Sequence, residues 1–349
     1  MPMTPRERWL AVLRRERPDR VPMDYWGTAE TTIKIMAELG CADERAMFER
    51  LRIDRLHRVE PAYVGPRLRA GYDVFGCRWR DVGYGDGVYR ECVGHPLVAC
   101  DTIEAIERSY TWPHADWYDY STLPAQVVGW EDYPISAGGS EPFLRYTELR
   151  GMEAAYKDLV SRPELVHYAL GKLYDLAYEQ TRRSYEALAG RVDVSYVAED
   201  LGSQHGLLFA PRMIQAFFLP GMRRMVELAH EADVVAFCHS DGAIRPIIPD
   251  LLDAGIDILN PIQWRCPGMD RRELKREFGG RVVFHGAVDN QHTLAFGSPA
   301  DVRQEVLDNI QMLGTGGGYI LAPCHNIQAI SPVENIVAMY EAGYEFGTL

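Results

Sequence analysis

The sequence predicts a single-domain (β/α)8 TIM barrel over residues 1–349, and three observations carry this prediction. Eight stretches of strand length recur along the chain, and the apolar run over 234–238 is continuous, as in a parallel strand buried on both faces. Most of these stretches are followed by a segment with helical periodicity. Polar residues cluster directly after the stretches, where barrels of this class build their sites. A doubly wound sheet is the alternative, but no G-x-G-x-x-G pattern follows the first stretch.

The first helix is predicted by the residues at its start, Thr4, Pro5 and Glu7. Threonine can cap a helix, proline fits its first position, and a glutamate three residues after the cap completes a capping box. Strands and helices then alternate, with strands expected over residues 20–27, 56–64 and 134–139 and helices over 32–39 and 42–51.

Residues 72–98 interrupt this alternation. Gly, Tyr, Trp, Arg and Asp recur there with a period of two, and Gly-rich turning residues lie between the two stretches. This pattern predicts a β-hairpin inserted in the barrel. Such an insertion can serve as a lid or a partner surface, and a purely structural decoration is the commoner alternative.

From Arg145 onward the alternation of strands and helices is regular. Ser298 and Ser331 are each followed by a proline and, three positions on, by an acid, which predicts the start of the last two helices. Strands are expected over residues 193–198, 234–238, 256–260, 281–286 and 317–322, and helices over 149–160, 164–188, 211–232 and 243–254.

Composition narrows the classes of partner. The net charge of −13 argues against nucleic acid and anionic membranes as partners. No apolar run approaches the roughly 20 residues that a membrane helix requires, and the N-terminal arginines are mixed with acids, unlike a targeting peptide. The seven cysteines are scattered and never form C-x-x-C, so we expect a reducing, cytoplasmic setting.

The stretch from Asp233 to Gly242 is the centre of the predicted site. An apolar strand ends there in His239, Ser240 and Asp241, and a helical segment follows at once. Alternation along a strand points His239 and Asp241 to the same side, so the two can share one ligand. The alternatives are a structural histidine and an aspartate that caps the helix over 243–254.

Other polar residues follow the neighbouring strands. Each of them also has a structural alternative. One acid of the pair Glu199 and Asp200 can cap a helix, and Cys324 can be an ordinary core residue. Amides at loop ends often only satisfy backbone groups. Their shared position at strand ends nevertheless favours a site. We expect catalytic roles for His239, Asp241, Asp200 and Cys324, and cofactor or acceptor binding by Glu199, Asn260, Gln263, Asp289, Gln291, His325 and Asn326.

Four motifs in this half of the chain resemble one known family. They are H-S-D-G at 239–242, D-I-L-N-P-I-Q at 257–263, H-G-A-V-D at 285–289 and G-G-G-Y-I-L-A-P-C-H-N-I-Q at 316–328. They are similar to the uroporphyrinogen decarboxylase superfamily, and most of all to its corrinoid-linked methyltransferase branch. The N-terminal R-E-R-W-L-A-V-L-R-R-E-R-P-D-R-V-P is similar as well. The resemblance implies a (β/α)8 barrel with its site at the carboxyl ends of the strands.

The resemblance separates the branches by their chemistry. The decarboxylases carry arginines after the first strand for the carboxylates of their substrate, whereas this chain reads D-Y-W-G-T-A-E-T-T there. The thiol-methylating branch has a zinc pattern of His, Cys two residues later and a distant Cys. His239 and Cys324 match its first and last positions, but Asp241 replaces the first Cys. If zinc is present, the resemblance assigns His239 and Cys324 as ligands.

The remaining branch methylates tetrahydrofolate from a methyl-corrinoid, that is, methylcobalamin carried on a separate small protein, and this one-carbon reaction is our expectation. A pterin presents an amide and an aminopyrimidine edge, which carboxylates and carboxamides recognise. The chain has no D-x-H-x-x-G cobalamin pattern, so a partner must bring the corrinoid. Zinc-dependent transfer to a thiol, decarboxylation and a non-catalytic binding subunit are the alternatives.

Overall fold

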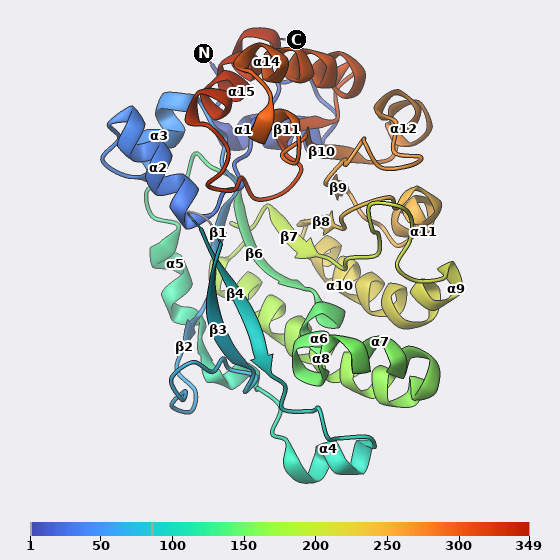
Figure 1. Cartoon of the computed structure of the whole chain (residues 1–349). Coiled ribbons are helices and arrows are strands. Elements are labelled where there is room, and N and C mark those ends of the chain that lie inside the picture. Colours follow the sequence, from blue (N-terminus) through green and yellow to red (C-terminus); the bar gives the residue numbers. More distant parts are fainter. Residues whose placement is uncertain (1, 85–86, 349) are drawn as a thin grey trace.

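A curled sheet of seven parallel strands forms the centre of the protein, with helices around its outside (Figure 1). The structure is a computed structural model and describes residues 2–84 and 87–348. In order across the sheet the strands are β1 (His57–Val59), β6 (Ile135–Ser140), β7 (Val194–Val197), β8 (Val235–His239), β9 (Ile258–Asn260), β10 (Val283–Val288) and β11 (Tyr319–Pro323). The predicted α/β class and parallel sheet are confirmed, and the sheet has seven strands where eight were expected.

The first expected strand, residues 20–27, is the one that is missing from the sheet. This segment lies parallel to β11 but bonds to it only locally, through the bridge between Met23 and Leu321 and the 2.8 Å bond from Asp24 N to Leu321 O. On its other side Asp54 N donates to Met23 O, and the carboxylate of Asp24 accepts from Leu56 N. The side chain of Asp24 therefore accepts a hydrogen bond from Leu56 N that a backbone carbonyl would accept in a continuous pair of strands.

The second expected strand, residues 56–64, divides into two. Its first part is β1 of the parallel sheet, and its second part is β2 (Ala62–Tyr63), which pairs antiparallel with β5 (Tyr118–Asp119). Pro61 stands between them and has no N–H to donate to a ladder. Within residues 72–98, β3 (Arg78–Tyr84) and β4 (Gly87–Gly94) pair antiparallel and extend away from the sheet (Figure 1).

The helices follow the expected order along the chain. The capping box of Thr4 and Glu7 is present at the start of α1, and a capping box of Ser298 and Asp301 starts α14. The helices are α1 (Pro5–Leu13), α2 (Ala29–Leu39), α3 (Glu44–Leu51), α4 (Ile103–Ser109), α5 (Leu123–Gln126), α6 (Pro142–Arg150), α7 (Met152–Ser161), α8 (Pro163–Leu188), α9 (Pro211–Met213), α10 (Leu219–Glu231), α11 (Ile248–Asp253), α12 (Arg271–Phe278), α13 (Thr293–Phe296), α14 (Pro299–Asn309) and α15 (Val333–Phe346). Within the described ranges, none is long and apolar enough to cross a bilayer.

Four expected helices differ from the observed ones. The helix expected over 149–160 is divided at Gly151, where α6 has ended and α7 begins. The helix expected over 211–232 is broken by a π-helical turn at Ile214–Phe218. The helix expected over 243–254 begins only at Ile248, after a 3-10 turn at Arg245–Ile247. Ser331 does not cap α15, whose N-cap residue is Pro332.

The inner face of the sheet is built in layers. Val194, Phe237, Ile258 and Val283 form an apolar layer on four neighbouring strands, and Trp9 of α1 packs against the same cluster. Two residues further along each strand, the side chains point the same way again. The next layer toward the carboxyl ends is polar, with Tyr196, His239, Asn260 and His285. The fold thus places the candidate site directly above an apolar floor. A single domain over residues 1–349 stays a prediction.

Candidate functional site

Three side chains capable of binding a metal meet at the carboxyl ends of β7 and β8. They belong to Asp200, His239 and Asp241, and one ligand atom from each lies within 4.8 Å of the others. His239 Nε2 is 3.9 Å from Asp200 Oδ1, and the Asp200 side chain is 45% exposed. The group therefore extends from the buried His239 to the solvent-exposed Asp200. Three ligands with an open position are typical of catalytic metal sites, and zinc accepts all three side-chain types.

A chain of hydrogen bonds runs behind His239 through the buried polar layer. His239 Nδ1 lies 2.6 Å from Asn260 Oδ1, and Asn260 Nδ2 lies 2.7 Å from His285 Nδ1. His285 Nε2 is 3.1 Å from Asp24 Oδ2. His285, Asn260 and Asp24 are fully buried. We call Asp24, His285, Asn260 and His239 the relay.

The order of donors in the relay assigns the proton positions on both histidines. The Asp24 carboxylate only accepts, so the Nε2 of His285 carries a hydrogen, and its Nδ1 accepts from the Asn260 amide. The Asn260 carbonyl then accepts from Nδ1–H of His239. A neutral His239 therefore presents an unprotonated Nε2 toward Asp200 and Asp241, ready to bind a metal or a proton.

Asp24 is held as an anion at the buried end of the relay. Burial acts to raise the pKa of its carboxyl, but the hydrogen bonds from His285 and Leu56 N and the nearby charge of Arg55 outweigh it, and the pKa is lowered. Leu56 N and Trp26 Nε1 also donate to its two oxygens. The sequence identified His239 and Asn260 as site residues, but it did not predict that Asp24 and His285 join them in a buried chain of hydrogen bonds.

Asp241 is positioned by the loops around it. Its Oδ1 accepts from Gln263 Nε2 at 3.2 Å, and Gln263 Oε1 accepts from Gly242 N at 2.8 Å. Its backbone N donates to Asp200 Oδ1 at 3.1 Å. Burial raises the pKa of the Asp241 carboxyl, opposed by His239 and His325 and supported by Asp200. Because α11 begins seven residues later, at Ile248, Asp241 is not the cap of that helix.

Cys324 lies apart from the three-residue group. Its Sγ donates to Ile262 O at 3.4 Å, and burial raises the pKa of the thiol well above its usual value. Together with Gln291, Cys266 and other residues it lines a small neighbouring cavity. Within residues 2–84 and 87–348, the group with metal-ligand geometry consists of Asp200, His239 and Asp241 and does not include Cys324. Zinc held by His239 and Cys324 stays a prediction.

Two of the expected site residues are engaged in structural contacts. Glu199 is buried and accepts from Phe143 N at 2.8 Å, in the first turn of α6. Asp289 forms an ion pair with Arg265 and accepts from Gln291 N at 2.9 Å. His325 and Asn326 face the site, with His325 Nε2 3.9 Å from Asp241 and Asn326 lining the cavity beside it.

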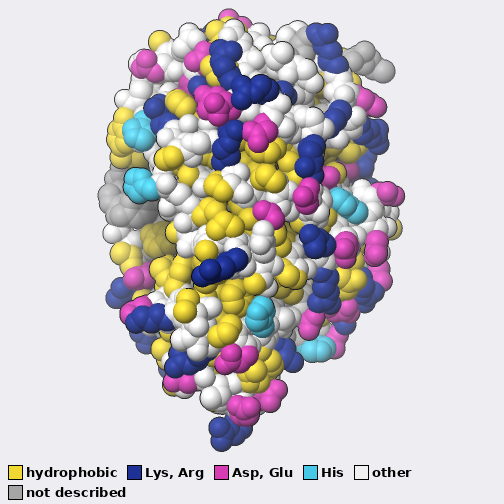
Figure 2. Space-filling model, turned by 90° about the vertical axis from the view of Figure 1, so that its right-hand side faces the viewer, with side chains coloured by type: hydrophobic (Ala, Val, Ile, Leu, Met, Phe, Trp, Pro, Cys, Tyr) yellow, Lys and Arg dark blue, Asp and Glu magenta, His cyan; other side chains and the backbone are white. Residues whose placement is uncertain are grey.

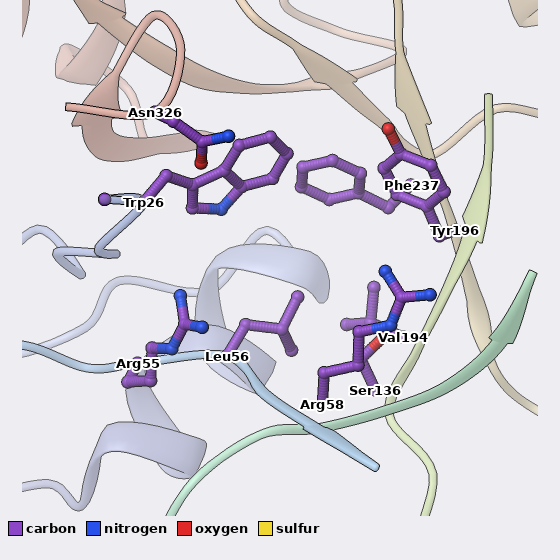
Figure 3. Close-up of a pocket in the computed structure, with 10 residues that line it drawn as sticks. Trp26, Arg55, Leu56, Arg58, Ser136, Val194, Tyr196, Phe237 and Asn326 are labelled. Carbon is purple, nitrogen blue, oxygen red and sulfur yellow. The ribbon is translucent and has the colours of Figure 1, made fainter. Parts of the chain in front are cut away.

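That cavity, of about 280 Å³, opens beside His239 (Figure 3). The rings of Trp26 and Tyr196 form its walls and lie 5.5 and 6.1 Å from the His239 ring. The guanidinium groups of Arg55 and Arg58 point into it from the side of β1 (Figure 3). A second cavity of about 290 Å³ shares Arg58 and Tyr196 with the first.

The sequence did not identify these arginines as site residues. The stretch after the first expected strand has no arginine, as noted above, but Arg55 and Arg58 lie before and within β1. Arginine next to a strand is common on protein surfaces, so only the curvature of the sheet shows that these two face the same space as Trp26.

Glu141, at the carboxyl end of β6, supports a prediction on pH. Burial raises the pKa of its carboxyl to about 7, opposed by His239 and supported by Asp200. The folded protein therefore holds more protons than the unfolded chain between about pH 4.5 and 7, and the free energy of unfolding falls as the pH rises through this window. In urea denaturation, Glu141→Gln should raise the free energy of unfolding by up to about 3 kcal/mol at pH 8 and should change it little at pH 4. An equal effect at both pH values would contradict the raised pKa.

Comparison of the sequence with known proteins places most of the chain in one family. Residues 131–346 match the family described as uroporphyrinogen decarboxylase (URO-D). Methylcobamide:CoM methyltransferase MtaA of Methanosarcina barkeri is 25% identical over 215 residues, which cover 62% of this chain and 59% of that protein. A uroporphyrinogen decarboxylase of Psychromonas ingrahamii is 25% identical over 219 residues, 61% of this chain and 55% of that protein. The chain thus spans little more than half the length of these curated relatives.

A solved structure supports the fold over the whole chain. The methyltransferase from Methanosarcina mazei superimposes with a TM-score of 0.67 at 21% identity and covers 99% of both chains. Its likeness extends to the N-terminal residues that the family match leaves out. The family match covers well over half of the chain, including the strand ends that carry Asp200, His239, Asp241 and Cys324. This chain is a member of the uroporphyrinogen decarboxylase family.

Proposed function

We propose that the protein transfers a methyl group from a methyl-corrinoid, carried on a separate small protein, to tetrahydrofolate. One observation carries the proposal: the buried His239, whose Nδ1 is bonded to Asn260, turns its Nε2 toward Asp200 and Asp241 beside an aromatic-walled cavity. A family that includes methylcobamide:CoM methyltransferases and decarboxylases supports an enzyme of this kind.

The donor atoms at the site favour a pterin over a thiol as acceptor. Activation of a thiol by zinc suits ligand sets rich in thiolate, whereas the group around His239 supplies two carboxylates and one imidazole. Cys324, which follows β11, has a raised thiol pKa and a hydrogen bond to Ile262 O. Carboxylates at Asp200 and Asp241 suit the amide and amino groups of a pterin edge.

The residues of the chain account for the proton that the reaction releases. When N5 of the acceptor takes the methyl group, it loses its hydrogen, and the electron pair of the broken carbon–cobalt bond stays with cobalt. The Nε2 of His239 accepts that proton, and the relay to Asp24 stabilises the imidazolium. Asp241, fixed by Gln263, orients the acceptor, and this positioning supplies a large part of the catalysis. A bound methyl-corrinoid supplies the electrophilic methyl group.

Zinc is the alternative use of the same three side chains. Asp200, His239 and Asp241 would hold it, with the relay orienting the His239 ring, as second-shell partners do in metal sites. The ion would supply a Lewis acid for a bound acceptor. Elemental analysis of wild type and of the His239→Ala and Cys324→Ser variants distinguishes the ligand sets.

We expect the corrinoid protein to dock across the loops at the carboxyl ends of the strands, because the corrinoid is too large to enter the barrel and its methyl group must reach the site there. Figure 2 shows the face that carries α9, α11 and α12, with apolar side chains gathered across its middle and charges of both signs around them. An apolar centre with a charged rim is the usual anatomy of a protein interface. Nucleic acid and membranes are not among the partners we propose.

Uroporphyrinogen is not among the substrates that we propose. Arg55 and Arg58 could bind carboxylates, but a cavity of about 280 Å³ is small for a tetrapyrrole with many carboxylates. We expect the purified protein to form no coproporphyrinogen from uroporphyrinogen, as measured by chromatography. Measurable conversion would show that the decarboxylase alternative is right.

Asp241 gives a prediction that separates the acceptors. Asp241→Ala should weaken folate binding or slow the transfer by about 1–3 kcal/mol, because a buried polar partner is lost, with little change in melting temperature. Asp241→Cys should gain zinc and lose folate activity. Asp250→Ala on α11 is a matched control on the surface. If Asp241→Ala lowers only the melting temperature, the residue has a structural role alone.

The test of the proposed function uses purified protein, free methylcobalamin and tetrahydrofolate. We expect 5-methyltetrahydrofolate and a strong loss of its formation in His239→Ala. The same assay with a small thiol in place of the folate should give little product. A protein that binds tetrahydrofolate but forms no product would be a binding subunit.

A further inference from the structure

The cavity beside His239 carries positive charge that the protein itself leaves largely uncompensated. Nη1 of Arg55 donates to the backbone carbonyl of Tyr25, and among the described residues Arg55 forms no ion pair with a carboxylate. Asp24 is the acid whose pKa Arg55 helps to lower, but its two oxygens are already occupied by donors from Leu56, Trp26 and His285. The remaining nitrogens of Arg55 are therefore available to a ligand.

Arg58 supplies a second guanidinium on the same side of the cavity (Figure 3). Its Nε pairs with Glu60 at 2.8 Å, on a side chain that is 58% exposed. Its guanidinium carbon lies 6.0 Å from the centre of the Tyr196 ring. Two planar guanidinium groups facing one space match the geometry of carboxylates, which arginine binds through two parallel hydrogen bonds.

The other wall of the cavity is flat and aromatic. Trp26 is fixed by the 3.0 Å bond from its Nε1 to Asp24, and its ring lies 6.0 Å from Phe237, nearly parallel at 27°. Tyr196 stacks against Phe237 at 6.1 Å and 23°. Rigid rings of this kind bind another flat ring with little loss of side-chain freedom. The cavity thus offers a stacking wall opposite two cations.

We infer that this cavity binds a ligand part that combines a flat aromatic ring with one or two carboxylates. The ring would lie against Trp26 and Tyr196, and the carboxylates on Arg55 and Arg58. The inference deepens the proposed function on which it rests, because the cavity adjoins His239 and tetrahydrofolate carries a benzoyl ring followed by glutamate carboxylates. We thus place the benzoylglutamate part of the acceptor in this cavity and its N5 next to His239.

Calorimetric titration with p-aminobenzoylglutamate, which lacks the pterin, tests the assignment without any methyl donor. We expect wild type to bind it and Arg55→Gln to bind it about tenfold or more weakly, because a charged hydrogen-bond partner is lost. Arg58→Gln should weaken binding as well, and its exposed side chain makes it the variant to use if Arg55→Gln does not fold. Arg224→Gln, on the outer surface of α10, is the matched control and should bind like wild type.

A neutral probe separates the charges from the stacking wall. p-Aminobenzamide has the ring without the carboxylates, and its binding should be the same in wild type and both arginine variants. Equal binding of p-aminobenzoylglutamate to wild type and both variants, or none to wild type, would overturn the assignment. If p-aminobenzoylglutamate binds as expected but no methyl group is transferred to tetrahydrofolate, the assignment of the cavity stands and the proposed function is refuted. Methyl transfer that is unchanged in both arginine variants would refute the cavity alone.

Discussion

Asn260→Ala is expected to lower the rate of methyl transfer by about 10–100-fold, as loss of a residue that orients a catalytic histidine does elsewhere. Among the described residues, Asn260 is the one that joins His239 to His285 by hydrogen bonds, of 2.6 and 2.7 Å. Without it, His239 loses the partner that keeps hydrogen on Nδ1, and its Nε2 is no longer held unprotonated. The free energy of unfolding should fall by about 1–3 kcal/mol for each buried partner left unpaired.

Asn335→Ala is the matched control for this substitution. Asn335 is also buried, and its amide donates to Leu294 O and Gly297 O, away from the relay. It should lose stability but keep the activity of the folded protein. Nitrogen NMR of ¹⁵N-histidine should show a protonated Nδ1 on His239 in wild type and not in Asn260→Ala. A folded Asn260→Ala protein with wild-type rates would refute the role of the relay.

Asp54→Ala is expected to cause the largest loss of stability, about 3–5 kcal/mol in urea denaturation. Asp54 is buried between Arg8 and Arg20, with N–O distances of 2.8 and 2.7 Å, and its Oδ2 also accepts from Met23 N. Removing it leaves the buried guanidinium of Arg20 without its anion and leaves that of Arg8 with Asp19 alone. These contacts tie α1 and the segment beside β11 to the start of β1.

The control for Asp54 is an exposed ion pair. Asp175 pairs with Arg224 on the surface, where its side chain is 64% exposed. Asp175→Ala should cost less than about 1 kcal/mol, as exposed pairs usually do. If Asp54→Ala costs no more than Asp175→Ala, the N-terminal segment is not held by the Asp54 cluster.

The sequence predicts the later part of the fold well because that part is locally consistent. From β6 onward each strand is a short apolar run, and the alternation with helices is regular, so the pattern identifies β7, β8, β9, β10 and β11. The N-terminal part is different. There Asp24 replaces backbone ladder bonds with side-chain bonds, and Pro61 divides a strand, so periodicity alone misassigns both segments.

The site is predictable in the same uneven way. His239, Asp241 and Asp200 stand at strand ends, and the structure brings them together. Asn260 also stands at a strand end, but it lies in the buried relay and not at the ligand. Arg55 and Glu141 acquire their significance only from the cavities they line, since the curvature of the sheet decides which residues beside its strands face inward.

The central claim is that His239 and its relay serve methyl transfer to a folate at this edge of the sheet. Methylcobalamin with a ¹³C-labelled methyl group, offered together with tetrahydrofolate and a small thiol in one reaction, tests it most directly. Carbon NMR should show the label on N5 of the folate in wild type and unreacted methylcobalamin in His239→Ala. Label on the thiol, or on the folate at the same rate in both proteins, would contradict the account.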